Sequence, residues 1–185
     1  SVFSKSTANI GTNRQFVWNS SIIDAEKTTA DLVQHSPVRQ NVVFETDKEW
    51  EGGFADSFNV VNAGDRYLLY YSTYNTKDDV KICIAESRDG IGWTKPDLGL
   101  VSFNGKDSNI IFDGSAGITD GFFVFKDTNP ACPSEEKYKA IVKDNYFERH
   151  GLTSYFSADG VNFRPGRFIT DQGAFDTMNV VFWDE

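Results

Sequence analysis

The chain has 185 residues, and aromatic side chains make up 15% of it. This composition excludes a disordered or low-complexity chain, because such chains have too few apolar residues to form a core. The formal net charge of -9 excludes a nucleic-acid backbone as the expected partner, since phosphate binding needs a basic surface. No apolar run reaches the roughly 18 residues of a membrane helix, so we expect no membrane partner. The N-terminus has no signal-peptide pattern, and the localisation stays open.

Short runs of Val, Ile, Tyr and Phe bounded by Gly, Asn and Asp recur along the chain, while helical periodicity is almost absent. This pattern predicts an all-β protein. The one helical stretch that we expect lies near Asp24 to Leu32. In chain order we expect strands over Phe58 to Val61, Tyr67 to Tyr74, Val80 to Ala85, Gly121 to Phe125, Lys137 to Val142, Leu152 to Phe156 and Asn179 to Trp183.

Two motifs recur. An aspartate opens an apolar strand in three segments, Ala55 to Val61, Thr119 to Phe125 and Phe175 to Val181. A turn of Ser, any residue, Asp and Gly, with an aromatic side chain three residues after the Gly, recurs at Ser87 to Trp93 and at Ser157 to Phe163. Each complete unit therefore predicts four antiparallel strands, which is the blade of a β-propeller.

The repeats divide the chain into four parts. Residues 1–53 are an N-terminal segment, 54–117 a first blade, 118–173 a second blade and 174–185 the first strand of a third. Propellers close with about four to eight blades. We therefore expect either a piece of a longer protein or a ring completed by self-association with a second copy. The first is favoured, because a chain ending at Glu185 would expose an apolar edge strand.

Taken together, these segments resemble the five-bladed β-propeller glycoside hydrolases, the broad group that acts on fructans, arabinans, xylans and mannosides. The chain is most similar to members labelled as resembling the N-terminal domain of glycosyl hydrolase family 32. The resemblance implies a five-bladed propeller that takes a carbohydrate substrate. It covers roughly residues 14 to 185 and is carried by Gln34 to Pro37, Asn41 to Val43, Trp50 to Gly52, Ser87 to Pro96 and Phe175 to Asp184.

Three positions depart from this family. Its fructan-active members place the first aspartate in Trp-Met-Asn-Asp-Pro and the second in Arg-Asp-Pro, whereas Asp56 follows Ala and Asp120 follows Thr. The third blade usually supplies a glutamate as general acid, and the matching strand here begins with Asp176. These departures argue against a conventional retaining fructosidase.

The resemblance implies that Asp56, Asp120 and Asp176 converge at one mouth of the propeller, where first strands line the channel. A glycosidase needs one protonated carboxyl to donate to the leaving oxygen and one carboxylate to attack or to activate water. We expect Asp56 as nucleophile or base, Asp120 as the orienting carboxylate and Asp176 as the acid. The alternative for each is a structural turn closed by backbone N–H groups.

Five further residues are candidates for substrate contact. Trp50, Phe54 and Trp183 carry aromatic faces on which sugar rings stack, and the alternative for each is core packing. Glu51 is a reserve carboxylate, with a solvated loop as the alternative. His35 is a candidate proton carrier or hydroxyl contact, or else an exposed loop residue.

No spacing of cysteine and histidine matches a metal site, so we expect no metal and no cofactor. Cys83 and Cys132 are expected as free thiols. The sequence thus predicts a glycoside hydrolase that acts on an oligo- or polysaccharide. The alternatives are a carbohydrate-binding propeller without catalysis and an interaction scaffold for another protein.

Overall fold

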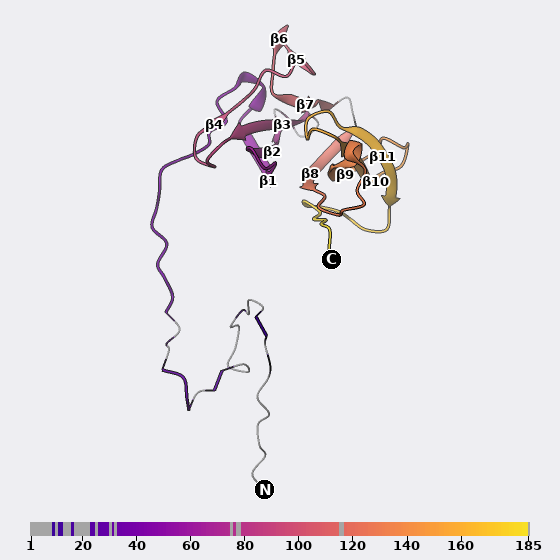
Figure 1. The fold of residues 1–185 in the computed structure, drawn as a ribbon. Helices are drawn as coiled ribbons and strands as arrows, with labels where there is room; N and C mark the ends of the chain where they lie inside the picture. The colour runs from indigo at the N-terminus through magenta and orange to yellow at the C-terminus, as the bar shows by residue number, and fades with distance from the viewer. Residues whose placement is uncertain are drawn as a thin grey trace. The chain divides into compact units, whose positions relative to one another are not determined.

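The computed structural model describes residues 9, 11, 12, 16, 23, 24, 26–29, 31, 33–74, 76, 79–114 and 117–184, and at 119 and 120 it describes the backbone alone. The chain forms two units, Ser1–Gln40 and Asn41–Glu185. Every strand found in the described residues lies in the second unit (Figure 1).

The first unit contains a single turn at the place where a helical stretch is expected. The amides of Lys27 and Thr28 donate to the carbonyl of Asp24 at 3.1 and 2.9 Å. The carboxylate of Asp24 also accepts a hydrogen bond from the amide of Glu26 at 3.2 Å. Such a local side-chain bond competes with helix formation. The expected helix near Asp24 to Leu32 is therefore wrong for the residues that the structure describes there.

The first sheet follows a short 3-10 helix, η2 (Glu49–Glu51). Its strands pair antiparallel in the order β1-β2-β3-β4, and β7 also pairs with β3. The strands are β1 (Phe54–Asn62), β2 (Tyr67–Tyr74), β3 (Val80–Ser87), β4 (Trp93–Thr94) and β7 (Ile110–Phe112). Between β4 and β7 the chain forms a small hairpin of β5 (Ser102–Phe103) and β6 (Lys106–Asp107).

The second sheet has four antiparallel strands in the order β11-β10-β9-β8. They are β8 (Ile118–Lys126), β9 (Tyr138–Asp144), β10 (Gly151–Ser157) and β11 (Arg164–Thr170), with the 3-10 helix η4 (Ser134–Glu136) between β8 and β9. The strands β1 to β4 and β8 to β11 therefore follow the chain order in their sheets, and only β7 pairs out of that order among the strands that the structure describes. The all-β prediction and the antiparallel four-strand units are confirmed.

One expected strand is missing. Asn179 to Trp183 forms no strand, and in the described part of the chain no segment pairs with residues 174–184. In β1 and β8 the equivalent residues pair with the strand that follows them, β2 or β9. A β-strand is held by hydrogen bonds to a neighbour, so strand-like residues alone do not form one.

A β-bulge follows the aspartate in both first strands. The register runs from Asp56↔Ser72 to Asn59↔Tyr70 in β1, and from Asp120↔Lys143 to Phe123↔Ile141 in β8. Two residues of the first strand thus oppose one residue of the second, which defines a bulge. The residue after each aspartate has a left-handed backbone, with φ of 53° at Ser57 and 67° at Gly121. The repeat found in the sequence is therefore also a repeat of backbone geometry.

The main hydrophobic core lies between the two sheets. Apolar side chains of both sheets form this cluster, including Leu68, Tyr70, Ile82, Ile84, Phe122, Val124, Tyr138, Val142 and Tyr155. A second cluster covers the opposite face of the first sheet, where Trp50 and the half-buried Phe44 and Phe103 pack on Tyr71 and Cys83. The first sheet is therefore covered on both faces.

Candidate functional site

The two first strands begin at the same end of the molecule. The side-chain oxygen of Asn59 accepts a hydrogen bond from the amide of Val124 at 2.8 Å, and Lys126 Nζ donates to the carbonyl of Ala63 at 2.6 Å. The later residue of β1's side, Ala63, contacts the later residue of β8, Lys126. The strands β1 and β8 therefore run side by side in the same direction. We call the end where these strands begin the aspartate end.

Asp56 lies at the aspartate end with its carboxylate half-buried. Its Oδ1 accepts a hydrogen bond from the hydroxyl of Tyr74 at 3.2 Å. The ring of Phe54 lies 5.6 Å from the ring of Tyr74 and is 59% exposed. A carboxylate and an open aromatic face are therefore neighbours on one surface.

The segment that follows Asp176 lies against the start of β8. A Cβ atom built on Gly121 would lie 3.1 Å from Met178 Cα and 3.3 Å from the carbonyl oxygen of Thr177. Only glycine fits at position 121, because its backbone is left-handed and because residues 177 and 178 leave no room for a side chain. The structure brings the backbone after Asp120 next to residues 177–178, and the carboxylate of Asp176 itself is exposed.

Ser57 adopts the left-handed conformation without being glycine, at φ 53° directly after Asp56. This conformation costs a residue with a side chain roughly 1–2 kcal/mol. Such strain persists only where the surrounding structure enforces it, and it is often found at functional sites. In β1 the bulge enforces it, because Asp56 and Asn59 are both held in the ladder with β2.

Glu51 and Trp50 are buried, which corrects their expected role in substrate contact. Glu51 Oε1 accepts a hydrogen bond from the hydroxyl of Tyr71 at 2.5 Å and lies 2.7 Å from Lys95 Nζ. The indole nitrogen of Trp50 donates to the side-chain oxygen of Asn109 at 2.8 Å. Burial raises the pKa of Tyr71 far above its ordinary value. These groups form an internal network that holds η2 on the first sheet.

Two other expected contacts are exposed. Trp183 lies in the segment 174–184 and is 42% exposed, and His35 lies exposed in the first unit. Neither has a hydrogen-bond partner among the described residues that would orient it toward a ligand. Their roles in substrate contact stay predictions.

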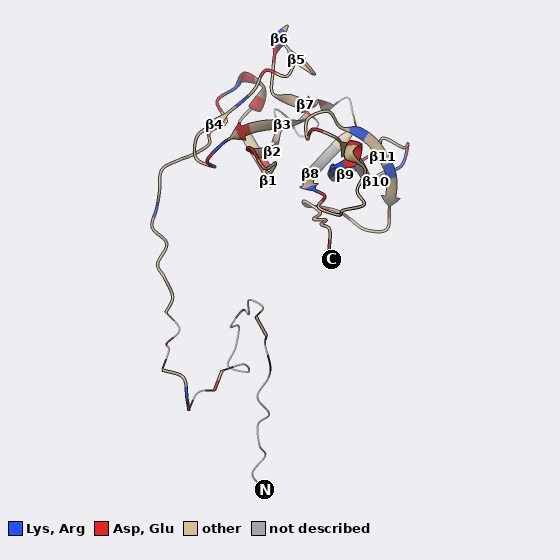
Figure 2. Ribbon diagram, viewed as in Figure 1, with Lys and Arg blue, Asp and Glu red and all other residues tan. Residues whose placement is uncertain are grey.

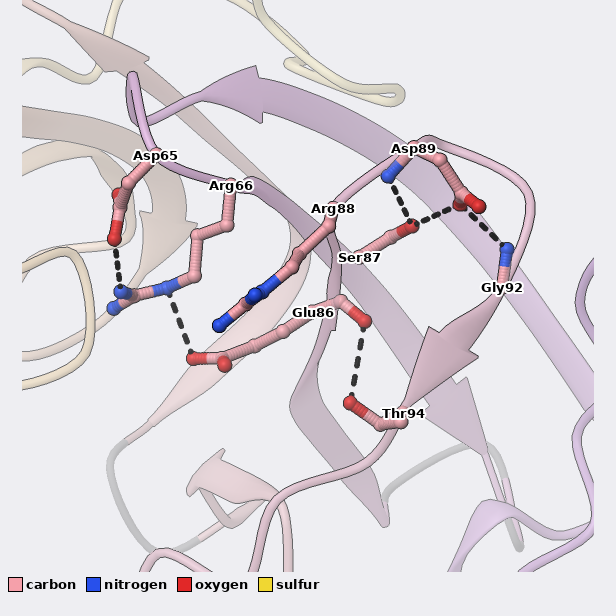
Figure 3. A pocket seen from close by; sticks show the side chains of 8 residues that line it. All are labelled: Asp65, Arg66, Glu86, Ser87, Arg88, Asp89, Gly92 and Thr94. Carbon is pink, nitrogen blue, oxygen red and sulfur yellow. Dashed lines mark hydrogen bonds and ion pairs between the residues drawn. The ribbon is translucent and has the colours of Figure 1, made fainter.

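A hollow of about 660 Å³ lies at the other end of the first sheet, which we call the turn end (Figure 3). Arg66 contacts Asp65 at 3.1 Å and Glu86 at 3.3 Å across it. The carboxylate of Asp89 accepts hydrogen bonds from the amides of Ile91 and Gly92, both at 2.8 Å. The carboxylates at this hollow thus already have partners. One side of the hollow is the turn of Ser87 to Trp93, which the sequence shows as a motif, and the other side is the separate turn at Asp65 and Arg66.

Asp144 is a buried carboxylate at the aspartate end of the second sheet. It accepts hydrogen bonds from the hydroxyls of Thr153 and Tyr155, both at 2.6 Å. Burial and this bond raise the pKa of Tyr155 well above its ordinary value. Asp144 is fully buried and links β9 to β10 through these two hydrogen bonds.

The remaining chemistry is sparse. Acidic and basic residues are interspersed over the second unit (Figure 2). Within the described ranges no group of three or more His, Cys, Asp or Glu side chains could hold a metal ion, and no helix is long and apolar enough to cross a membrane. Cys83 and Cys132 are free thiols, and burial raises the pKa of Cys83 to about 12.

No family model matches the chain, and neither the curated proteins nor the solved structures contain a match to it.

Proposed function

We propose that the two sheets are blades of a β-propeller glycoside hydrolase and that a saccharide binds at the aspartate end. The observation that carries this proposal is the placement of Asp56, a half-buried carboxylate oriented by Tyr74 beside the exposed ring of Phe54. Carboxylates bind sugar hydroxyls, and the C–H faces of sugar rings pack on aromatic rings. The resemblance of the sequence to propeller glycosidases supports the same assignment.

In the proposed reaction the glycosidic C–O bond breaks and water is added across it. Asp56 attacks the anomeric carbon or activates the water, Asp176 protonates the leaving oxygen and Asp120 orients the partner carboxyl. The separation of the acting carboxyl groups decides the stereochemical course, with about 5 Å for retention and about 6.5–9.5 Å for inversion.

A binding module without turnover is the second candidate. It is favoured by the exposure of Asp176 in a segment that forms no strand. An acid that is not held within reach of the leaving oxygen gives little catalysis, while binding through Asp56 and Phe54 is unaffected.

The test uses the 185-residue chain with fructo-, arabino-, xylo- and manno-oligosaccharides. We expect at least one of them to raise the unfolding temperature, because a ligand that binds the folded state stabilises it. D56N should reduce this rise without removing it, because Phe54 still offers its ring to the sugar. D65N is the matched control, since Asp65 lies in the turn at the other end of β1 and is exposed.

The release of reducing ends then separates the two candidates. Stabilisation with release supports the hydrolase, and stabilisation without release supports the binding module. If no saccharide stabilises the chain, or if D65N reduces the effect as much as D56N does, the proposal is wrong.

A further inference from the structure

The pairing of β1 with β2 places four side chains on one face of the first sheet. Phe54 lies opposite Tyr74, and Asp56 lies opposite Ser72. Opposite residues of an antiparallel pair share a face, and residues two apart on one strand share it too. Tyr74 is thus the diagonal neighbour of Asp56, a distance that a long aromatic side chain spans. The hydrogen bond from the Tyr74 hydroxyl to Asp56 Oδ1 has this origin.

Tyr74 is held from several sides. Its backbone forms a bridge with Gly52, and its ring packs at the edge of the main core and beside Phe54. Because the ring is packed on these sides, the Tyr74 hydroxyl is held within hydrogen-bond distance of Asp56 Oδ1. The carboxylate that accepts this bond therefore loses rotational freedom. Asp56 Oδ2 accepts no hydrogen bond from the part of the chain that the structure describes.

We infer that Tyr74 is a positioning residue of the aspartate end. Its hydroxyl holds Oδ1 of Asp56 so that Oδ2 faces a sugar ring stacked on Phe54. This inference rests on the proposed function and narrows its substrate class to neutral, hydroxyl-rich sugars. A uronic acid or sulfated sugar would bring a second negative charge beside the carboxylate of Asp56.

A double-mutant cycle tests the inference, with Kd for the stabilising oligosaccharide as the readout. Y74F keeps the ring and removes only the hydroxyl, and we expect it to weaken binding roughly 3- to 10-fold. In the D56N background the same change should alter Kd less than about twofold, since the hydroxyl then has no charged carboxylate to orient.

Y67F is the matched control, because Tyr67 lies at the other end of β2. It should leave Kd unchanged. If Y74F behaves like Y67F, or weakens wild type and D56N equally, Tyr74 is no positioning residue although the binding function stands. Tighter binding of a uronic-acid oligosaccharide than of its neutral counterpart contradicts the substrate class. A wild-type chain that binds no saccharide overturns the proposed function and this inference together.

Discussion

The two turns of Ser, Asp and Gly share the same hydrogen bonds from backbone amides to the Ser and Asp side chains. Asp89 Oδ1 accepts from the two amides that follow Gly90, and Asp159 Oδ1 accepts in the same way after Gly160, all at 2.8 Å. Both glycines are left-handed, with φ of 75° and 79°. A turn built by bonds over two or three residues therefore forms from its own sequence, whatever surrounds it.

Their surroundings differ. The carbonyl of Gly160 accepts a hydrogen bond at 2.7 Å from the hydroxyl of Tyr70 in the other sheet. The carbonyl of Gly90 accepts instead from the indole of Trp93 in its own turn at 3.2 Å. A Cβ on Gly160 would lie 2.9 Å from Leu68, whereas one on Gly90 would meet nothing within 4 Å. The same turn thus joins two sheets in one repeat and is open in the other.

The sheets differ in the same sense. Nearly every side chain of β3 is buried, because the second sheet covers one face and the segment with Phe44 and Trp50 covers the other. In β10 buried side chains alternate with half-buried ones at its C-terminal end. The comparison shows that the segment with Phe44 and Trp50 covers the face of the first sheet that points away from the second sheet.

The largest loss of stability is expected for the ion pair that holds this covering segment on the first sheet. Lys95 is 9% exposed and lies 2.7 Å from the fully buried Glu51. K95M leaves that carboxylate buried without its cation, which costs about 3–5 kcal/mol of unfolding free energy. Urea denaturation measures it. K106M is the control, since Lys106 and Glu49 form an exposed pair at 3.7 Å, and a change beyond about 0.5 kcal/mol is not expected there.

An equal cost of K95M and K106M would show that the network does not hold η2 on the first sheet.

The next effect separates the two turns. G90A should lower the free energy of unfolding by roughly 1–2 kcal/mol, because it places a side chain on a left-handed backbone. G160A should have the same cost, and its new Cβ would also clash with Leu68 and Tyr70, which adds about 1–3 kcal/mol. Thermal unfolding of both variants measures the difference. Equal losses would mean that the second turn does not pack against the first sheet in solution.

The smallest effect concerns pH. Burial raises the pKa of Asp159, but hydrogen bonds from the side chain and amide of Asn162 outweigh it and lower the pKa from 3.8 to about 2. A lowered pKa stabilises the fold above pH 3.8, and this contribution is lost as the pH falls through about 2. D159N should therefore lower the unfolding temperature at pH 5, and its gap to wild type should shrink toward pH 2.

D89N makes the comparison with the first turn. Hydrogen bonds from the backbone amides of Gly92 and Ile91 lower the pKa of Asp89, but Gly92 has no side chain to add the bond that Asn162 gives Asp159. We expect a smaller gap for D89N at pH 5. A gap that widens as the pH falls would contradict the assignment for either turn.

The sequence predicted the local features and missed those that depend on distant partners. Tyr67 to Tyr74 forms a strand with the expected bounds, because its apolar pattern is local. Glu51 was expected as a reserve carboxylate at the site or, as the alternative, as a solvated loop residue, but its partners Tyr71 and Lys95 lie 20 and 44 residues away. Residues 174–184 have the strand pattern without the partner. No local pattern predicts either outcome.

The site was predicted in part. Asp56 is a candidate from sequence because the aspartate recurs at the head of an apolar strand, and Phe54 because its aromatic ring lies close to it in the chain. Their roles in substrate contact stay predictions. Tyr74 was missed, since its contact with Asp56 depends on the hairpin register, and that register contains a bulge. The sequence indicates the bulge only weakly, through Gly121, which occupies the position that Ser57 has in the first repeat.

The most direct test of the central claim is a backbone amide NMR titration of the 185-residue chain with the oligosaccharide that stabilises it. We predict that the amide signals of Ser57 and Gly121 move, while those of Gly90 and Gly92 at the turn end stay in place. Shifts confined to the turn end, or none at Ser57, would contradict a saccharide site at the aspartate end.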